Sequence, residues 1–374
     1  MKSGFDAIVV GAGPAGCAAA YDLAAHGRQV LLLDKCEFPR LKPCAGALTI
    51  KTLNALRFDA APVIRRVCRE MKLSLGEAGK ILTNDRPIAV MTVREEFDQF
   101  CLNQCAARGA DFRAAHRLTA LARDGEDWIV STNHGTFRGR FLIGADGANS
   151  QVRKLLSRTN PLRFGLALET CVAVDRPGDW PMEFDFAAVD RGYGWVFPKD
   201  DHLNVGLYSL NPTIPHAAQK LAAFVAAKTG RTISRPIHGH RIPHDGRRAR
   251  FAWSNACLIG DAAGLIDPLL GEGIYNAIRS GQLAARAIIH GNGSGRTDFA
   301  GEIDEVRRDL ASYDSDTRRF YSNIRRGYRR LMRFPVSRVL INGFSLGLPI
   351  IRIKRRTLAL LFPQSARRND NWSA

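Results

Sequence analysis

Three glycines near the start of the chain have a spacing that suits the binding of a dinucleotide. Gly11, Gly13 and Gly16 form a GxGxxG motif, and the acidic Asp34 follows later in the chain. Such glycines let the backbone approach a pyrophosphate, while the N-terminus of the next helix offers free N–H groups and an acidic side chain accepts hydrogen bonds from ribose hydroxyls. The alternative is a glycine-rich structural turn, and the surrounding elements decide between the two.

The elements around this motif match what such a site needs. Residues 5–10 form a continuous apolar run, as expected of a strand covered on both faces. Residues 15–26 form an alanine-rich helical stretch, and residues 30–33 form a second apolar run that ends at Asp34. The glycines therefore follow a strand and open a helix, and we predict a Rossmann-type βαβ unit that binds a dinucleotide.

Two later segments resemble the remaining conserved motifs of flavoproteins of the p-hydroxybenzoate hydroxylase type. Residues 141–150 are an apolar strand that ends in an Asp-Gly turn at Asp146, and residues 257–264 are a second strand that ends in Gly-Asp at Asp261. The resemblance implies FAD as the cofactor, with Asp261 on the ribityl hydroxyls and residues 271–273 near the flavin ring. A helix that begins there would place its positive dipole end near the flavin.

Arg94 matches the Arg-x-x-Phe/Leu-Asp helix start of the same superfamily, in which the arginine lies beside FAD. An exposed helix arginine is the alternative. The full set of residues that we expect to bind the cofactor is Gly11, Gly13, Pro14, Ala15, Gly16, Asp34, Lys35, Arg40, Cys44, Ala45, Gly46, Arg94, Asp146, Gly260, Asp261, Pro268, Gly271, Gly273 and Ile274. The sequence has no second GxGxxG motif, so NADPH would act transiently, or another external donor would supply electrons.

Two segments resemble geranylgeranyl reductases. Residues 38–46 are similar to their Lys-x-Cys-Gly-Gly segment, with Ala45 where that family usually has glycine. Residues 192–198 are similar to their Tyr-x-Trp-x-Phe-Pro segment, which lines the substrate cavity against the flavin. The resemblance extends from residue 5 to about residue 290. It implies that reduced flavin saturates C=C bonds of an isoprenoid or a similar apolar substrate.

Cys44, Tyr193 and Trp195 are the candidate catalytic residues. A thiol beside the flavin can act as an acid, and aromatic faces can stabilise cationic character that develops on carbon. For each of them a purely structural role in a buried core is the alternative.

Other functions stay open at this point. One is a flavin monooxygenase that acts on an aromatic or peptidyl side chain. Another is a halogenase-like enzyme, although Tyr193 replaces the first tryptophan of the Trp-x-Trp-x-Ile-Pro hallmark of halogenases. The third is a flavoprotein that acts mainly through a protein partner.

The chain has eight cysteines, and they are scattered without a CxxC pair. This pattern favours reduced thiols in a cytosolic protein over a disulfide framework or a zinc site. His238, His240 and His244 lie in a segment rich in proline and arginine, at a spacing that predicts no metal site. We expect these histidines to be structural or solvated.

The pattern of the sequence changes after about residue 162, where alternating apolar and polar residues indicate an antiparallel sheet. We predict an α/β protein with an α+β insertion. Its Rossmann-type FAD-binding domain would comprise residues 1–70, 97–162 and 246–300. The inserted antiparallel β-sheet substrate domain would comprise residues 71–96 and 163–245, and residues 301–374 would form a basic helical C-terminal region.

The positive charge of the chain is concentrated in that last region. The formal net charge is +18, of which residues 317–374 contribute +13. A basic segment with apolar interruptions suits binding to an anionic membrane surface or to an acidic protein partner. The alternative without a binding function is a solvated helical segment that covers the FAD domain. We expect no nucleic acid partner, because no binding motif accompanies the charge. We predict attachment and no chemistry for this region, and a cytoplasmic location with peripheral membrane binding under the first alternative.

Overall fold

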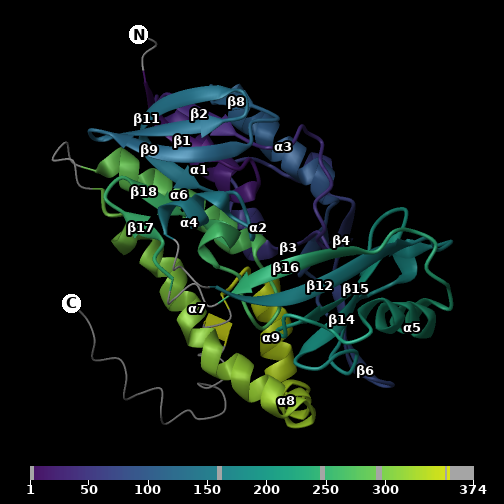
Figure 1. Ribbon diagram of the computed structural model, residues 1–374. Coiled ribbons are helices and arrows are strands. Elements are labelled where there is room, and N and C mark those ends of the chain that lie inside the picture. Colours follow the sequence, from purple (N-terminus) through teal and green to yellow (C-terminus); the bar gives the residue numbers. More distant parts are fainter. Residues whose placement is uncertain (1–3, 158–161, 245–248, 292–296, 350–351, 354–374) are drawn as a thin grey trace, which may run out of the picture.

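The computed structural model describes residues 4–157, 162–244, 249–291, 297–349 and 352–353, and it contains two large sheets joined by helices and loops (Figure 1). This architecture is the expected α/β fold with a β-rich insertion. Among the described residues, no helix is both long enough and apolar enough to cross a bilayer.

The first sheet carries the predicted dinucleotide site. The order of its strands is β17 (Ala252–Trp253), β18 (Ala256–Leu258), β11 (Gly135–Gly144), β1 (Phe5–Val10), β2 (Val30–Leu33) and β8 (Asp111–Arg113), while β10 (Asp127–Thr132) pairs with β11 and β9 (Leu118–Asp124) with β10. The strands from β18 to β8 are parallel, so their carboxyl ends meet at one edge. The helices that belong to this half are α1 (Pro14–Ala25), α3 (Arg94–Ala107), α4 (Gln151–Leu156), α6 (Ile274–His290) and the 3-10 turn η3 (Gly260–Ala263).

The second sheet forms most of the insertion. The order of its strands is β16 (His238–His244), β12 (Arg163–Val172), β15 (Leu203–Ser209), β14 (Gly192–Pro198), β13 (Met182–Asp185), β5 (Glu70–Leu75) and β6 (Ala78–Thr83). The prediction of a fully antiparallel sheet is wrong at one place, because β13 and β5 pair in parallel. β5 lies in the first segment of the insertion and β13 in the second, so the two strands are not consecutive and no hairpin turn joins them.

Alternation along β14 separates the two faces of this sheet. Tyr193, Trp195 and Phe197 belong to one apolar cluster, whereas Val196 packs with the helix α5 (Ala217–Thr229) on the other face. Successive side chains of a strand point to opposite faces, so the three aromatic residues share a face. That face is directed toward the C-terminal helices.

Shorter elements connect the two sheets. They are the small sheet of β3 (Ala47–Thr49), β7 (Ala89–Met91) and β4 (Arg66–Cys68), the helix α2 (Ile50–Ala55), and the 3-10 turns η1 (Ala61–Val63) and η2 (Pro177–Asp179). The loop that precedes β3 carries Cys44. Because this loop belongs to the segment that connects the two large sheets, both halves of the protein set its position.

Three helices follow α6, namely α7 (Phe299–Ser322), α8 (Ile324–Leu331) and α9 (Val336–Ser345). Figure 1 shows α7 running from the half of the protein with the first sheet to the second sheet, where α8 lies at the far end of the molecule, and α9 leads back from α8 toward α2. Buried residues of these helices, including Tyr321, Tyr328 and Ile341, belong to the same cluster as Trp195. The helix α8 packs on the second sheet, whereas α9 contacts both β6 of that sheet and α2, which lies within the predicted FAD-binding domain. Residues 354–374 lie outside the described part.

Candidate functional site

One cavity of about 1050 Å³ connects the dinucleotide motif with the aromatic face of the second sheet. Pockets for one small molecule usually measure about 300–1,000 Å³. The cavity is therefore large enough for a cofactor and a substrate together. Its walls combine the carboxyl ends of β1, β2 and β11 with the Cys44 loop, the segment before α6, and apolar side chains of the second sheet, α8 and α9.

The glycine motif forms a close-fitting cradle at one end of the cavity. Gly11 has a φ of +108°, and a Cβ there would lie 2.3 Å from the carbonyl oxygen of Ala145. No side chain caps the N-terminus of α1, so its first N–H groups are available to an anion. Asp34 fixes the loop, because its carboxylate accepts hydrogen bonds from the backbone N–H groups of Ala12 (2.8 Å) and Cys36 (2.9 Å). These features fit a pyrophosphate-containing cofactor.

Most of the predicted cofactor residues line this cavity. They are Gly11, Gly13, Pro14, Ala15, Asp34, Lys35, Arg40, Cys44, Ala45, Gly46, Arg94, Asp146, Asp261, Gly271, Gly273 and Ile274. Asp146 also accepts hydrogen bonds from the hydroxyl of Ser150 and from the N–H groups of residues 151 and 152, so its carboxylate holds the start of α4. Burial raises the pKa of Asp146.

Three predicted residues, Gly16, Gly260 and Pro268, do not line the cavity, and their contact with the cofactor stays a prediction. Gly16 is required for packing, because a Cβ there would lie 1.8 Å from the carbonyl oxygen of Gly11. Gly260 has a φ of +54° and donates its N–H to the hydroxyl of Ser280. Pro268 begins the loop that leads into α6, and it lines a second pocket instead.

That loop, residues 268–273, leads into α6 and is held by three tyrosines. Their hydroxyls donate to three successive carbonyls: Tyr208 to Pro268 (3.0 Å), Tyr321 to Leu269 (2.7 Å) and Tyr193 to Leu270. Gly273 stands at the N-cap of α6, no side chain caps the helix, and its first turn carries no acidic residue. The positive end of α6 therefore faces the cavity, as predicted.

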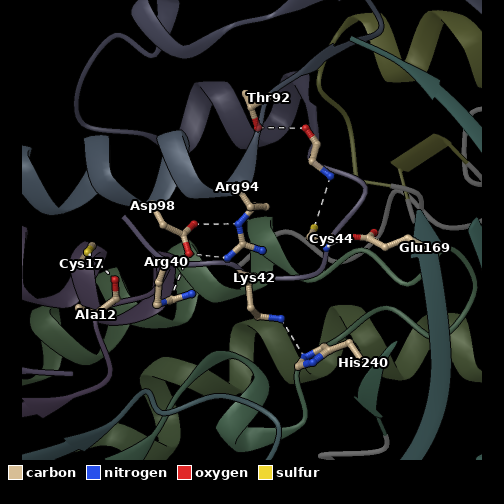
Figure 2. Close-up of polar contacts among 11 residues, drawn as sticks. Ala12, Cys17, Arg40, Lys42, Cys44, Thr92, Arg94, Asp98, Glu169 and His240 are labelled. Atoms are coloured by element: carbon tan, nitrogen blue, oxygen red, sulfur yellow. Dashed lines mark hydrogen bonds and ion pairs between the residues drawn. The ribbon is translucent and has the colours of Figure 1, made fainter. Parts of the chain in front are cut away.

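A buried charge cluster lies between the glycine motif and the Cys44 loop (Figure 2). Asp98 is fully buried and accepts two hydrogen bonds of 2.8 Å from Arg94, and Arg40 lies 3.2 Å from the same carboxylate. Burial disfavours the charge of Arg94, but Asp98 and Cys44 raise the pKa of the guanidinium above its ordinary value. Both arginines line the cavity, so Arg94 is not an exposed helix residue.

Lys42 adds a further cation to this wall of the cavity. Its ammonium lies 2.8 Å from Nε2 of His240 (Figure 2), and burial lowers the pKa of both groups, that of His240 to about 3. A neutral imidazole accepts a hydrogen bond from the lysine. His240 lines the cavity, and the expectation that it is structural or solvated stays a prediction. Within the described part of the chain, no three His, Cys, Asp or Glu side chains are grouped as a metal site needs.

The Cys44 loop is clamped by polar groups from distant elements. Glu169 of β12 accepts a hydrogen bond from the N–H of Cys44 (2.8 Å), and Lys199, just after β14, donates to the carbonyl of Ala45 (2.6 Å). Thr92 donates to the carbonyl of Gly46 through both its N–H (2.8 Å) and its hydroxyl (3.0 Å). Burial raises the pKa of Glu169 and lowers that of Lys199 to about 8.

Aromatic side chains line the other end of the cavity. The rings of Tyr193 and Trp195 lie 6.2 Å apart, and the ring of Tyr208 lies 5.3 Å from that of Tyr193. The indole N–H of Trp195 donates to Oδ1 of Asn204 (2.7 Å), and Asn204 in turn interacts with Glu169. A continuous polar chain therefore links Trp195 to the backbone of Cys44. The three predicted catalytic residues all line this one cavity.

Sequence reasoning did not single out Glu169, Lys199 or Asn204. A signal was available for Glu169, because it is a lone acid within an otherwise apolar strand segment. It also did not identify the apolar wall that α7, α8 and α9 supply, which consists of Phe320, Leu331, Leu340 and Phe344. The C-terminal region therefore also forms part of the cavity wall, and its role in attachment stays a prediction.

Comparisons with known proteins agree with this geometry. The family described as FAD binding domain matches residues 5–167. The geranylgeranyl diphosphate reductase of Oryza sativa subsp. japonica is 32% identical over 337 residues, which cover 82% of this chain and 70% of that protein. The chain belongs to the geranylgeranyl reductase family. It is an FAD-dependent oxidoreductase.

Two further proteins are similar to this chain. A menaquinone reductase of Mycobacterium tuberculosis is 31% identical over 76% of this chain and 76% of its own length. The crystal structure of a geranylgeranyl bacteriochlorophyll reductase-like protein from Thermoplasma acidophilum matches 98% of each chain with a TM-score of 0.74 at 21% identity. The two chains therefore share a fold.

Proposed function

We propose that the protein uses reduced FAD to saturate C=C bonds of an isoprenoid or a similarly apolar substrate. The observation that carries the proposal is the division of one cavity into a charged end, with the glycine cradle, and an aromatic end, with Tyr193 and Trp195. The Cys44 loop lies where the two ends meet. Two relatives, named as reductases of geranylgeranyl diphosphate and of menaquinone, support the same class of reaction.

The residues of the charged end would hold the cofactor. The free N–H groups at the starts of α1 and α6 suit the pyrophosphate and the flavin edge, and Asp261 suits the ribityl hydroxyls. When bound, FAD supplies a hydride for the reduction of the substrate. Arg94 and Lys42 place positive charge beside this position, which favours the negative charge of a reduced flavin.

The chain must also supply a proton to the second carbon of the alkene. We assign this proton to Sγ of Cys44, which lies against Arg94 and whose loop is held by Glu169 and Lys199. An isolated alkene lacks a polarising carbonyl, so protonation develops cationic character on carbon. The faces of Tyr193 and Trp195 stabilise that charge, and their neighbours exclude water from it.

Tyr193 is assigned an orienting and electrostatic role and not the role of the acid. Its hydroxyl donates to the carbonyl of Leu270, and burial raises its pKa. The phenol therefore stays protonated and its ring orientation is fixed. We therefore assign the role of the acid to Cys44 and not to Tyr193.

Two cysteine variants test the assignment. Cys44→Ala should retain FAD and slow the substrate-dependent reoxidation of the anaerobically reduced protein by about 10²-fold or more, the usual contribution of a general acid. Cys171→Ala is the matched control, because Cys171 is also partly buried but does not line the cavity. Equal reoxidation rates in the two variants would exclude Cys44 as the acid.

A further inference from the structure

The helix α8 presents a row of arginines to the outside. Arg325, Arg326, Arg329 and Arg330 are exposed on one face, while Tyr328 on the opposite face is buried and donates its hydroxyl to the carbonyl of Leu73 in β5 (2.9 Å). Residues three and four apart share a helix face, so the four cations form one surface. The buried tyrosine fixes the direction in which that surface points.

These arginines have no acidic partner among the described residues. Arg318, one turn before the end of α7, pairs with Asp314 at 2.7 Å, but no ion pair involves the four arginines of α8 within that part of the chain. Like charges at such spacings repel and destabilise a helix. The presence of four such arginines on one helix face therefore indicates that this face binds an anionic surface outside the chain.

An exposed aromatic residue lies directly beside this charge. Phe334 follows α8 and is 83% exposed, the largest exposure of any large apolar side chain in the described residues. Arg333 precedes it, and Arg338 on α9 is also exposed. A phenylalanine surrounded by arginines matches the boundary between lipid headgroups and acyl chains, where the cations meet phosphates and the ring enters the apolar layer.

We propose that the arginine face of α8, together with Arg333, Phe334 and Arg338, docks onto an anionic lipid bilayer. The inner sides of the same helices carry Leu331, Leu340 and Phe344, which line the aromatic end of the cavity. Docking therefore brings the bilayer next to the wall of the cavity. The consequence that the substrate is a membrane-resident lipid rests on the proposed function, whereas the docking itself does not.

Vesicle cosedimentation of the full-length FAD-bound protein tests the proposal without any substrate. We expect binding to phosphatidylcholine vesicles that contain phosphatidylglycerol, and little binding to phosphatidylcholine alone. Screening should reduce the binding steeply between about 0.1 M and 0.5 M NaCl, because the Debye length falls from about 10 Å toward 3 Å near 1 M. Each arginine near the surface should contribute about fivefold to partitioning.

Two variants and a matched control separate the parts of the surface. Arg329→Gln/Arg330→Gln should weaken binding about 25-fold, and Phe334→Ser should weaken it while leaving the salt dependence in place. Lys220→Gln/Arg235→Gln removes the same charge from exposed positions on the α5 side of the second sheet and should bind like the unaltered protein, because α5 packs on the opposite face. All variants should keep their FAD content and melting temperature.

Three results would overturn the proposal. The first is equal binding of the α8 variant and the α5 control, and the second is equal binding to vesicles with and without anionic lipid. The third is capture by polyglutamate but not by anionic vesicles, which would assign the surface to an acidic protein. Because no turnover is measured, each of these results leaves the proposed reductase function standing, and a failed reductase assay leaves the docking proposal standing.

Discussion

Lys199 should lower the stability of the protein at neutral pH, and the effect should disappear in alkali. The side chain is 2% exposed and its pKa is lowered from 10.5 to about 8 by burial. Below pH 8 the amine is charged in both the folded and unfolded states, so the cost of burying the charge is fully present. Between pH 8 and about 10.5 the folded protein has released this proton and the unfolded chain has not, so the cost declines as pH rises and is absent above 10.5.

The magnitude follows from the same values. A pKa difference between 10.5 and about 8 corresponds to about 3 kcal/mol. Lys199→Met removes this cost but leaves the carbonyl of Ala45 without its hydrogen bond, which costs about 1–3 kcal/mol. The variant should therefore be as stable as the unaltered protein or up to about 2 kcal/mol more stable at pH 7, and about 1–3 kcal/mol less stable near pH 10.5.

Thermal melts of both proteins between pH 7 and about pH 10.5 measure this difference. At about 2.1 cal/mol/K per residue over 374 residues, 1 kcal/mol corresponds to about 1.3 °C, so the gap in melting temperature should change by about 4 °C over the full pH interval. Lys220→Met alters an exposed lysine and should give a gap that does not depend on pH. A constant gap for Lys199→Met would refute the reasoning.

Two further predictions concern the two ends of the cavity. Asp261→Ala should purify with much less flavin, because loss of the ribityl acceptor costs about 1–3 kcal/mol of binding, or about 5- to 150-fold in affinity; full flavin absorbance would contradict the assignment. Trp195→Ala should keep FAD but lose turnover or change substrate preference in steady-state kinetics, because the indole lines the aromatic end and bonds Asn204. Unchanged kinetics with a lowered melting temperature would show that Trp195 contributes to packing and not to turnover.

The elements that the sequence predicted well are those with local signals. The apolar runs and the glycines predicted β1, α1 and β2 almost to the residue, and α6 begins where it was expected, directly after residues 271–273. The glycine pattern also placed the cofactor end of the cavity, since the positive φ of Gly11 and the close approach of Gly16 to Gly11 are properties of the loop itself.

The residues that the sequence missed act through long-range packing. Glu169, Lys199 and Thr92 reach the Cys44 loop from three segments that are far apart in the chain, so no spacing predicts their meeting. The packing of α8 against the second sheet could not be predicted for a related reason. Its apolar residues alternate with arginines, and the surface that buries them, near Leu73 on β5, lies about 250 residues earlier in the sequence.

The product that forms from the substrate in a single turnover most directly tests the claim that reduced flavin saturates C=C bonds. The FAD-bound protein is reduced without oxygen and mixed with a prenyl substrate such as geranylgeranyl diphosphate, and the product is analysed by mass spectrometry with and without isotopically labelled O₂. The account predicts a product that gains two hydrogen atoms per saturated double bond, in equal yield without oxygen. A product that forms only with O₂ and contains the labelled oxygen would contradict the reductase mechanism and establish a monooxygenase.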